Sequence, residues 1–118
     1  MQRDARAYLA DIIDACDAII VALQGMDLDS YRENRLVRSA VEREFIIIGE
    51  ATTILARRSP ELFSRITEGR RIVDFRNQLT HEYPNVNDTV VWAIADRDVP
   101  LLLRECIAII GDLSVDDS

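Results

Sequence analysis

An uninterrupted apolar belt lies within the stretch EREFIIIGEATTIL, residues 42–55. The stretch belongs to a longer pattern, residues 30–57, in which apolar side chains recur every three or four positions. This spacing predicts an amphipathic helix, but at residues 45–48 every side of that helix is apolar. A helix of this kind is covered on more than one side, so we expect it either centrally in a bundle or at a subunit interface.

Similar apolar spacing continues on both sides of this stretch, while no strand-like alternation exceeds four residues. The pattern therefore predicts an all-α fold, an up-and-down bundle of four to five main helices in one domain, residues 1–118. Besides 30–57, the expected helical segments are 4–24, a short turn at 60–66, 69–82, a short helix at 88–94, and 99–113.

Turn-forming residues are expected to separate these helices. Asp29 or Ser30 is suited to cap the second helix, and Ser59 precedes a proline that fits the first position of the short turn. Asn87 or Asp88 is suited to start the helix after the third. The expected breaks are QGMDLDS (24–30), RRSPEL (57–62), NVND (85–88) and DRDVP (96–100).

The composition limits the classes of function. A formal charge of −7 argues against broad, sequence-independent binding of nucleic acid. The charge is uneven, however, because residues 57–76 hold six arginines and three acids, a local charge of +3. The longest apolar run, FIIIG, is too short for a membrane span, and residues 1–20 lack the apolar core of a signal peptide. We therefore expect a cytoplasmic protein that does not interact with membranes.

The cysteine and histidine content argues against a metal centre. Cys16 and Cys106 are too far apart in sequence for a metal knuckle, so both are expected to be reduced core residues. The chain has a single histidine, whereas zinc sites usually require several histidine or cysteine ligands. No metal and no cofactor is expected.

That single histidine lies in RNQLTHEYP, residues 76–84, at the end of the third major helix. Pro84 disfavours helical geometry at the residue before it. Asn77 and His81 are four apart and share a helix face, where they can hydrogen-bond. Arg76 and His81, by contrast, diverge by roughly 140° around the helix axis. One chain alone makes a poor His–Arg site, but a second copy across a two-fold axis could bring these groups together.

An imidazole and a guanidinium suit work on a phosphodiester. His81 can move protons near neutral pH, and Arg76 can hold a phosphate and stabilise charge in the transition state. RNA supplies its own nucleophile, the 2′-hydroxyl. Arg70 and Arg71, in the positive window that ends at the motif, are candidate substrate-binding residues.

Structural interpretations of the same residues remain open from residue types alone. A histidine near a helix C-terminus commonly caps carbonyl groups. Asn77 equally fits an exposed polar residue, and Tyr83 a ring at the edge of the core. Glu50, an acid on an otherwise apolar helix, is expected to have a partner, and an ion pair or a capping role is favoured over catalysis.

The sequence resembles the HepT-like proteins of the HEPN superfamily over nearly its whole length. RNQLTHEY matches their R-x4-H-x-Y pattern, in the common form with Asn after the Arg. It departs from many relatives in having Glu82 between the His and the Tyr, where they carry a small residue. The accompanying landmarks, in order, are IIIGEA (46–51), VNDTVVWAI (86–94) and VPLLLREC (99–106).

This resemblance implies a HEPN-like helical fold and a toxin of a type II or type VII-like toxin–antitoxin pair. Such a toxin is a metal-independent endoribonuclease that acts as a homodimer, and its partner is a minimal nucleotidyltransferase antitoxin. Arg76 and His81 would be catalytic, Asn77 would support them, and Tyr83 would receive AMP from the antitoxin. The alternative is a non-catalytic HEPN module that binds a nucleotide or a protein and acts with the nucleotidyltransferase. A purely structural bundle with a capping histidine is a third, weaker interpretation.

Overall fold

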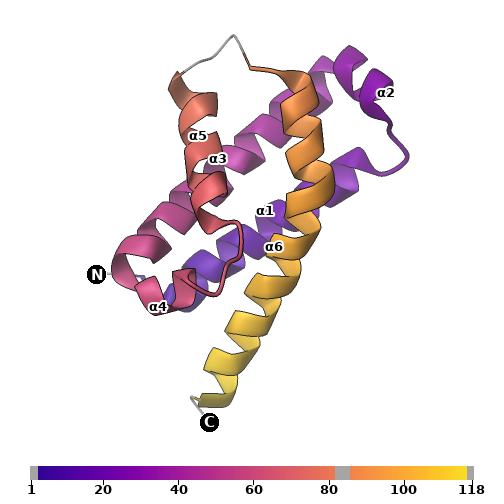
Figure 1. Cartoon of the computed structure of the whole chain (residues 1–118). Coiled ribbons are helices and arrows are strands. Elements are labelled where there is room, and N and C mark those ends of the chain that lie inside the picture. The colour runs from indigo at the N-terminus through magenta and orange to yellow at the C-terminus, as the bar shows by residue number, and fades with distance from the viewer. Residues whose placement is uncertain (1–2, 82–85, 117–118) are drawn as a thin grey trace.

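The computed structural model describes residues 3–81 and 86–116, and these form helices and no strands (Figure 1). The predicted all-α class is confirmed, and four main helices, α1, α3, α5 and α6, pack as a bundle. Two short helices, α2 and α4, flank α3 in sequence. The bounds are α1 (Ala5–Leu23), α2 (Leu28–Glu33), α3 (Arg35–Arg58), α4 (Pro60–Phe63), α5 (Gly69–His81) and α6 (Asp88–Asp116).

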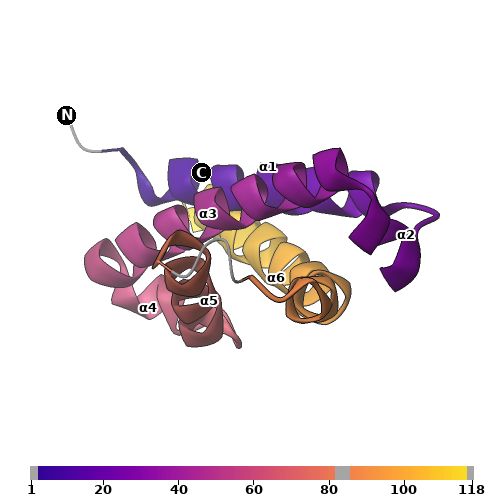
Figure 2. The same ribbon diagram turned by 90° about the horizontal axis from the view of Figure 1, so that it is seen from above.

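Helix α3 lies at the centre of the fold. It packs on α1 and on α5, and also contacts α2 and α4. Figure 2 shows α1 on one side of α3 and α5 on the other. Within the apolar belt, Phe45 and Ile48 are fully buried, whereas Ile46 and Ile47 are half-buried. The expectation of a central helix is confirmed, and two side chains of its belt remain at the surface.

The core is a single cluster that joins α1, α3, α5 and α6. The rings of Phe45 and Phe75 meet edge to face at 5.0 Å between centroids and tie α5 to α3. Cys16 and Cys106 are free thiols in this core, as expected. Burial raises the pKa of both thiols, that of Cys106 to about 12, so they behave as small apolar side chains.

The predicted start of the second helix was wrong. Asp27 caps the short helix α2 instead, accepting from the Ser30 amide at 2.8 Å while the Ser30 hydroxyl accepts from the Asp27 amide at 2.9 Å. Asn34 then adopts an extended backbone and ends α2. Its side-chain oxygen accepts from the Val37 amide at 3.1 Å, so that α3 begins at Arg35. The cap at Asn34 therefore divides residues 30–57 between two helices, whereas the apolar spacing alone predicts a single helix there.

The predicted break at residues 96–100 was also wrong, because α6 continues through Pro100. The proline lacks the amide that would bond to the Asp96 carbonyl, but Asp96 is exposed and water can satisfy that group. Figure 1 shows the axis of α6 changing direction partway along its length. The helix persists because its buried face is continuous on both sides of the proline: Val91, Ala95, Val99, Leu102, Cys106 and Ile109. Although α6 is long, no described helix is both long and apolar enough to cross a membrane.

The other predicted boundaries agree more closely with the structure. The Asn87 side chain accepts from the amides of Thr89 and Val90 at 2.9 and 3.4 Å, at the start of α6. Ser59 is the N-cap residue of α4 and Pro60 its first helical residue, although the Ser59 side chain makes no capping hydrogen bond. Local polar residues thus mark where these helices start.

Replacing Asn34 with Ala should lower the free energy of unfolding by roughly 1 kcal/mol, since the cap of α3 is lost. Asn34→Asp keeps an acceptor oxygen at the same place and should retain most of the stability. Urea unfolding followed by circular dichroism measures both. Equal losses for the two variants would show that the cap does not stabilise α3.

Candidate functional site

Helices α3 and α5 cross in very close contact at Gly49. The aliphatic stem of Arg76 lies directly on the backbone of α3 at this point. A Cβ atom added to Gly49 would lie 2.1 Å from the Arg76 Cβ and 2.2 Å from its Cγ, far inside van der Waals contact. Only glycine fits here, because any larger residue would push the two helices apart. The crossing therefore fixes where the Arg76 side chain leaves α5.

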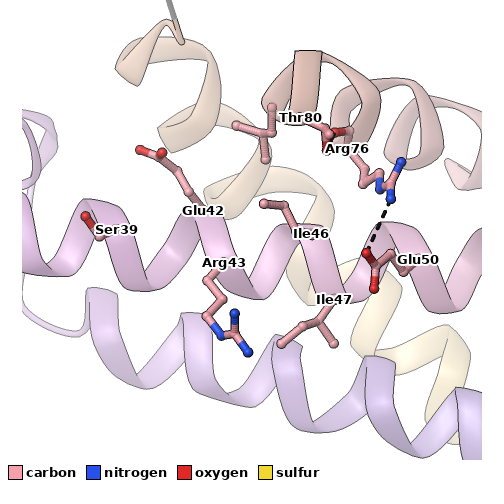
Figure 3. Close-up of a pocket in the computed structure, with 9 residues that line it drawn as sticks. Ser39, Glu42, Arg43, Ile46, Ile47, Glu50, Arg76 and Thr80 are labelled. Carbon is pink, nitrogen blue, oxygen red and sulfur yellow. Dashed lines mark hydrogen bonds and ion pairs between the residues drawn. The ribbon is translucent and has the colours of Figure 1, made fainter. Parts of the chain in front are cut away.

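Two oxygen atoms hold the Arg76 guanidinium above this crossing. Nη2 donates to Glu50 Oε1 at 3.3 Å (Figure 3). Nη1 donates to Asn77 Oδ1 at 3.1 Å. The Nε atom is buried and has no hydrogen-bond partner, while 26% of the side chain is exposed. The stem and Nε face the protein, so the exposed part is the terminal end of the guanidinium. The expected ion pair of Glu50 is confirmed.

This ion pair orients Arg76 more than it stabilises the fold. The Glu50 side chain is 56% exposed, and exposed pairs of this kind typically contribute no more than about 1 kcal/mol. A guanidinium with one carboxylate partner and an exposed terminal edge retains N–H groups for a second anion. Arg76 is therefore placed to bind a phosphate oxygen.

A surface hollow of about 620 Å³ opens beside Arg76, between α3 and α5 (Figure 3). Ile46, Ile47 and Leu79 give it an apolar lining. Glu42 also lines it, and burial raises the pKa of its carboxyl group. The charge of Asp88 raises that pKa further, and Arg38 opposes the shift. Burial and the neighbouring carboxylate of Asp88 thus both shift the Glu42 pKa upwards relative to that of an exposed glutamate.

His81 lies apart from this arrangement. It is the last residue of α5 and is exposed to solvent. Because α5 is continuous from residue 69 to 81, Arg76 and His81 are separated by roughly 140° around the axis and about 7.5 Å along it. His81 is not among the residues that line the hollow. The structure thus brings Arg76, Asn77 and Glu50 together, but not His81.

The expected hydrogen bond between Asn77 and His81 is absent from the described part of the chain. The Asn77 oxygen accepts from Arg76 instead. Within residues 3–81 and 86–116, no hydrogen bond or ion pair involves the imidazole, so no capping of a helix carbonyl by His81 is seen there either. Glu82 and Tyr83 lie outside the described residues.

The two arginines predicted to bind substrate have different surroundings. Arg70 is exposed, and Arg71 Nε lies 3.2 Å from Asp98 Oδ2 of α6. Asp98 Oδ2 is buried, and the contact has the distance of an ion pair without the geometry of a hydrogen bond. Both arginines line a separate hollow between α5 and α6. Their role in binding substrate stays a prediction.

Gly49 was not among the residues predicted for the site. An isolated glycine inside a helical pattern is nevertheless a recognised sign of a close approach or a functional position. Glu42 was missed as well, because the burial that affects it depends on how α3 packs on its neighbours.

A family model described as "Ribonuclease HepT-like" matches residues 12–109. The chain belongs to the HepT-like family. HepT-like relatives include a protein named "Putative RNase MJ1380" from Methanocaldococcus jannaschii, 31% identical over 88% of this chain and 94% of the relative. A second, "Probable ribonuclease HepT" from Thermococcus cleftensis, is 28% identical over 86% of this chain and 92% of the relative. No solved structure is significantly similar.

Replacing Gly49 with Ala should lower the free energy of unfolding by about 2 kcal/mol or more, because the methyl group overlaps the Arg76 stem. Gly111→Ala in α6 is the matched control, since a Cβ there meets nothing within 4 Å. That control should raise stability by about 0.5–1 kcal/mol through helix propensity. Denaturant unfolding gives both values, and equal effects would contradict the close crossing.

Proposed function

We propose that this HepT-like protein is a metal-independent endoribonuclease whose active site is completed by a second copy of the chain. The observation that carries the proposal is the separation of the two functional groups. The Arg76 guanidinium is held at the α3–α5 crossing with its end exposed, while His81 stands on another face of the same helix. In a two-fold dimer, Arg76 of one copy faces His81 of the other, and two equivalent sites form.

The proposed reaction uses the 2′-hydroxyl of RNA as nucleophile. A general base takes the 2′-hydroxyl proton, the 2′-oxygen forms a bond to the adjacent phosphorus, and the bond from phosphorus to O5′ breaks. A general acid gives a proton to O5′, which leaves as a 5′-hydroxyl, and a 2′,3′-cyclic phosphate remains. His81 serves in proton transfer, and Arg76 binds the non-bridging phosphate oxygens as negative charge builds up.

Asn77 and Glu50 have supporting roles in this scheme. Each accepts a hydrogen bond from a different terminal nitrogen of Arg76, and together they restrict its rotation. A guanidinium that is already oriented loses less freedom when it binds a phosphate.

The proposal extends to regulation by a nucleotidyltransferase antitoxin. The Tyr83 hydroxyl, two residues after His81, would attack the α-phosphorus of ATP, and pyrophosphate would leave. The AMP group adds bulk and negative charge two residues from the histidine in the sequence, which would oppose the approach of an RNA phosphate. The support is the match of Tyr83 to the tyrosine of the family motif.

A non-catalytic binding module that acts with the nucleotidyltransferase is the second candidate. Two observations favour it: the Glu50 carboxylate already occupies an N–H of Arg76, and the chain carries a net charge of −7. Both features oppose the entry of a polyanion. A module of this type would bind its partner without cutting RNA.

Cleavage of a mixed RNA pool in EDTA tests the proposal. Wild-type protein should cut RNA and leave 2′,3′-cyclic phosphate ends, while His81→Ala should be slower by about 100-fold or more. Arg104→Ala, at an exposed position on α6 that lines neither the hollow beside Arg76 nor the one beside Arg70 and Arg71, is the control and should keep wild-type activity. Well-folded, unmodified wild type that cuts no RNA would favour the binding module.

A further inference from the structure

A second hollow, of about 290 Å³, adjoins the one beside Arg76. It is lined by Thr53, Ile54 and Arg57 of α3 and by Val73 of α5. Arg76 and Glu50 line both hollows, so the two form one groove along the α3–α5 junction. The Arg76–Glu50 pair lies at the middle of that groove, and the ends extend in opposite directions along α3.

An arginine lies at each end of the groove. Arg43 lines the first hollow and Arg57 the second, and both are exposed. Arg43, Glu50 and Arg57 follow one another at intervals of seven residues on α3. They therefore lie in one row along the helix, about 10 Å apart. Figure 3 shows Arg43 and Glu50 on α3, with Arg76 reaching across from α5.

No acidic residue in the described part of the chain pairs with either end arginine. Several other arginines have acidic partners: Arg38 pairs with Asp88, Arg65 with Asp112, and Arg71 with Asp98. Arg43 and Arg57, however, take part in no hydrogen bond or ion pair with any residue of 3–81 or 86–116. Their charges therefore remain available to an anion that enters from solvent.

We propose that this groove binds a single strand of RNA, with Arg43 and Arg57 contacting phosphates on either side of the phosphate held by Arg76. The proposal rests on the proposed function, because it assigns the path of the substrate through that site. The repeated phosphates of an RNA strand match the positive charges of Arg43 and Arg57 on either side of Arg76. The groove also contains Arg76, which belongs to the proposed reaction centre.

The lining of the groove also defines what kind of recognition it supports. The residues between the arginines are chiefly aliphatic: Ile46 and Ile47 in one half, Ile54 and Val73 in the other. No aromatic ring is among the described residues that line either half, so the groove itself offers bases no aromatic stacking platform. Binding is therefore dominated by the phosphate backbone, with strong salt dependence and little base preference.

Glu50 opposes this binding through its charge. It lies in the same row as Arg43 and Arg57, and its carboxylate occupies Arg76 Nη2. A phosphate at Arg76 has to compete with that carboxylate. Glu50→Gln keeps the shape of the side chain and removes the competing charge, so it should tighten RNA binding by roughly threefold.

The test is fluorescence anisotropy with a labelled oligouridylate of about 12 nucleotides. The protein carries His81→Ala so that the RNA stays intact. Arg43→Gln and Arg57→Gln should each weaken binding by roughly three- to tenfold and reduce the slope of log affinity against log salt by about 0.7. Arg97→Gln and Arg104→Gln on α6 are the matched controls, since both arginines are exposed and lie outside the groove. They should leave the affinity and the slope nearly unchanged.

Four results would overturn the proposal. Equal losses in the groove and control variants would show that only net charge matters. Unchanged affinity in Arg43→Gln and Arg57→Gln would place the RNA elsewhere, and if wild type still cleaves RNA, the proposed function survives that result. Conversion of these variants to monomers in sedimentation would show that a second copy of the chain, not RNA, occupies the groove. If His81→Ala binds no RNA and wild type cuts none, the proposed function fails together with this inference.

Discussion

The contact between Gly49 and the stem of Arg76 is the constraint on which the arrangement of this molecule depends. Helix α5 packs chiefly on α3, and its crossing point is set by a glycine that leaves no room for a Cβ. Polar contacts also link the turn before α5 to α6: Arg65 pairs with Asp112 at 2.6 Å, and Thr67 bonds to Glu105. Exposed polar contacts of this kind contribute little to stability. The close crossing at Gly49 therefore governs the position of α5 and of the Arg76 guanidinium.

The geometry of one helix then separates the two groups that the proposed chemistry needs. Five residues of α-helix turn Arg76 and His81 to different faces, and α5 remains helical through both. The proposed dimer resolves this separation without any change in backbone, since a two-fold axis pairs unlike faces of two identical helices. On this view Glu50 has a double effect. It orients Arg76 through a hydrogen bond, and its charge opposes the phosphate that Arg76 would bind.

The sequence predicted those features that depend on local pattern. The helical class followed from the spacing of apolar residues, and the divergence of Arg76 from His81 followed from helix periodicity. The break predicted at Pro100 was wrong because the buried face of α6, including Val99 and Leu102, outweighs the local preference of proline. The close crossing at Gly49 and the pairing of Arg71 with Asp98 join residues far apart in sequence. The isolated glycine signals a close approach, but no local signal specifies which residue meets it or which acid pairs with Arg71.

Complementation between two inactive variants tests most directly whether the active site is shared between chains. Arg76→Ala and His81→Ala each remove one group, and co-expression produces a mixed dimer. In that dimer one site lacks both groups and the other keeps Arg76 from one chain and His81 from its partner. Random assembly should therefore restore about a quarter of wild-type RNA cleavage, although each variant alone is inactive. A mixture no more active than the separate variants would contradict a shared site, because both groups would then have to come from the same chain.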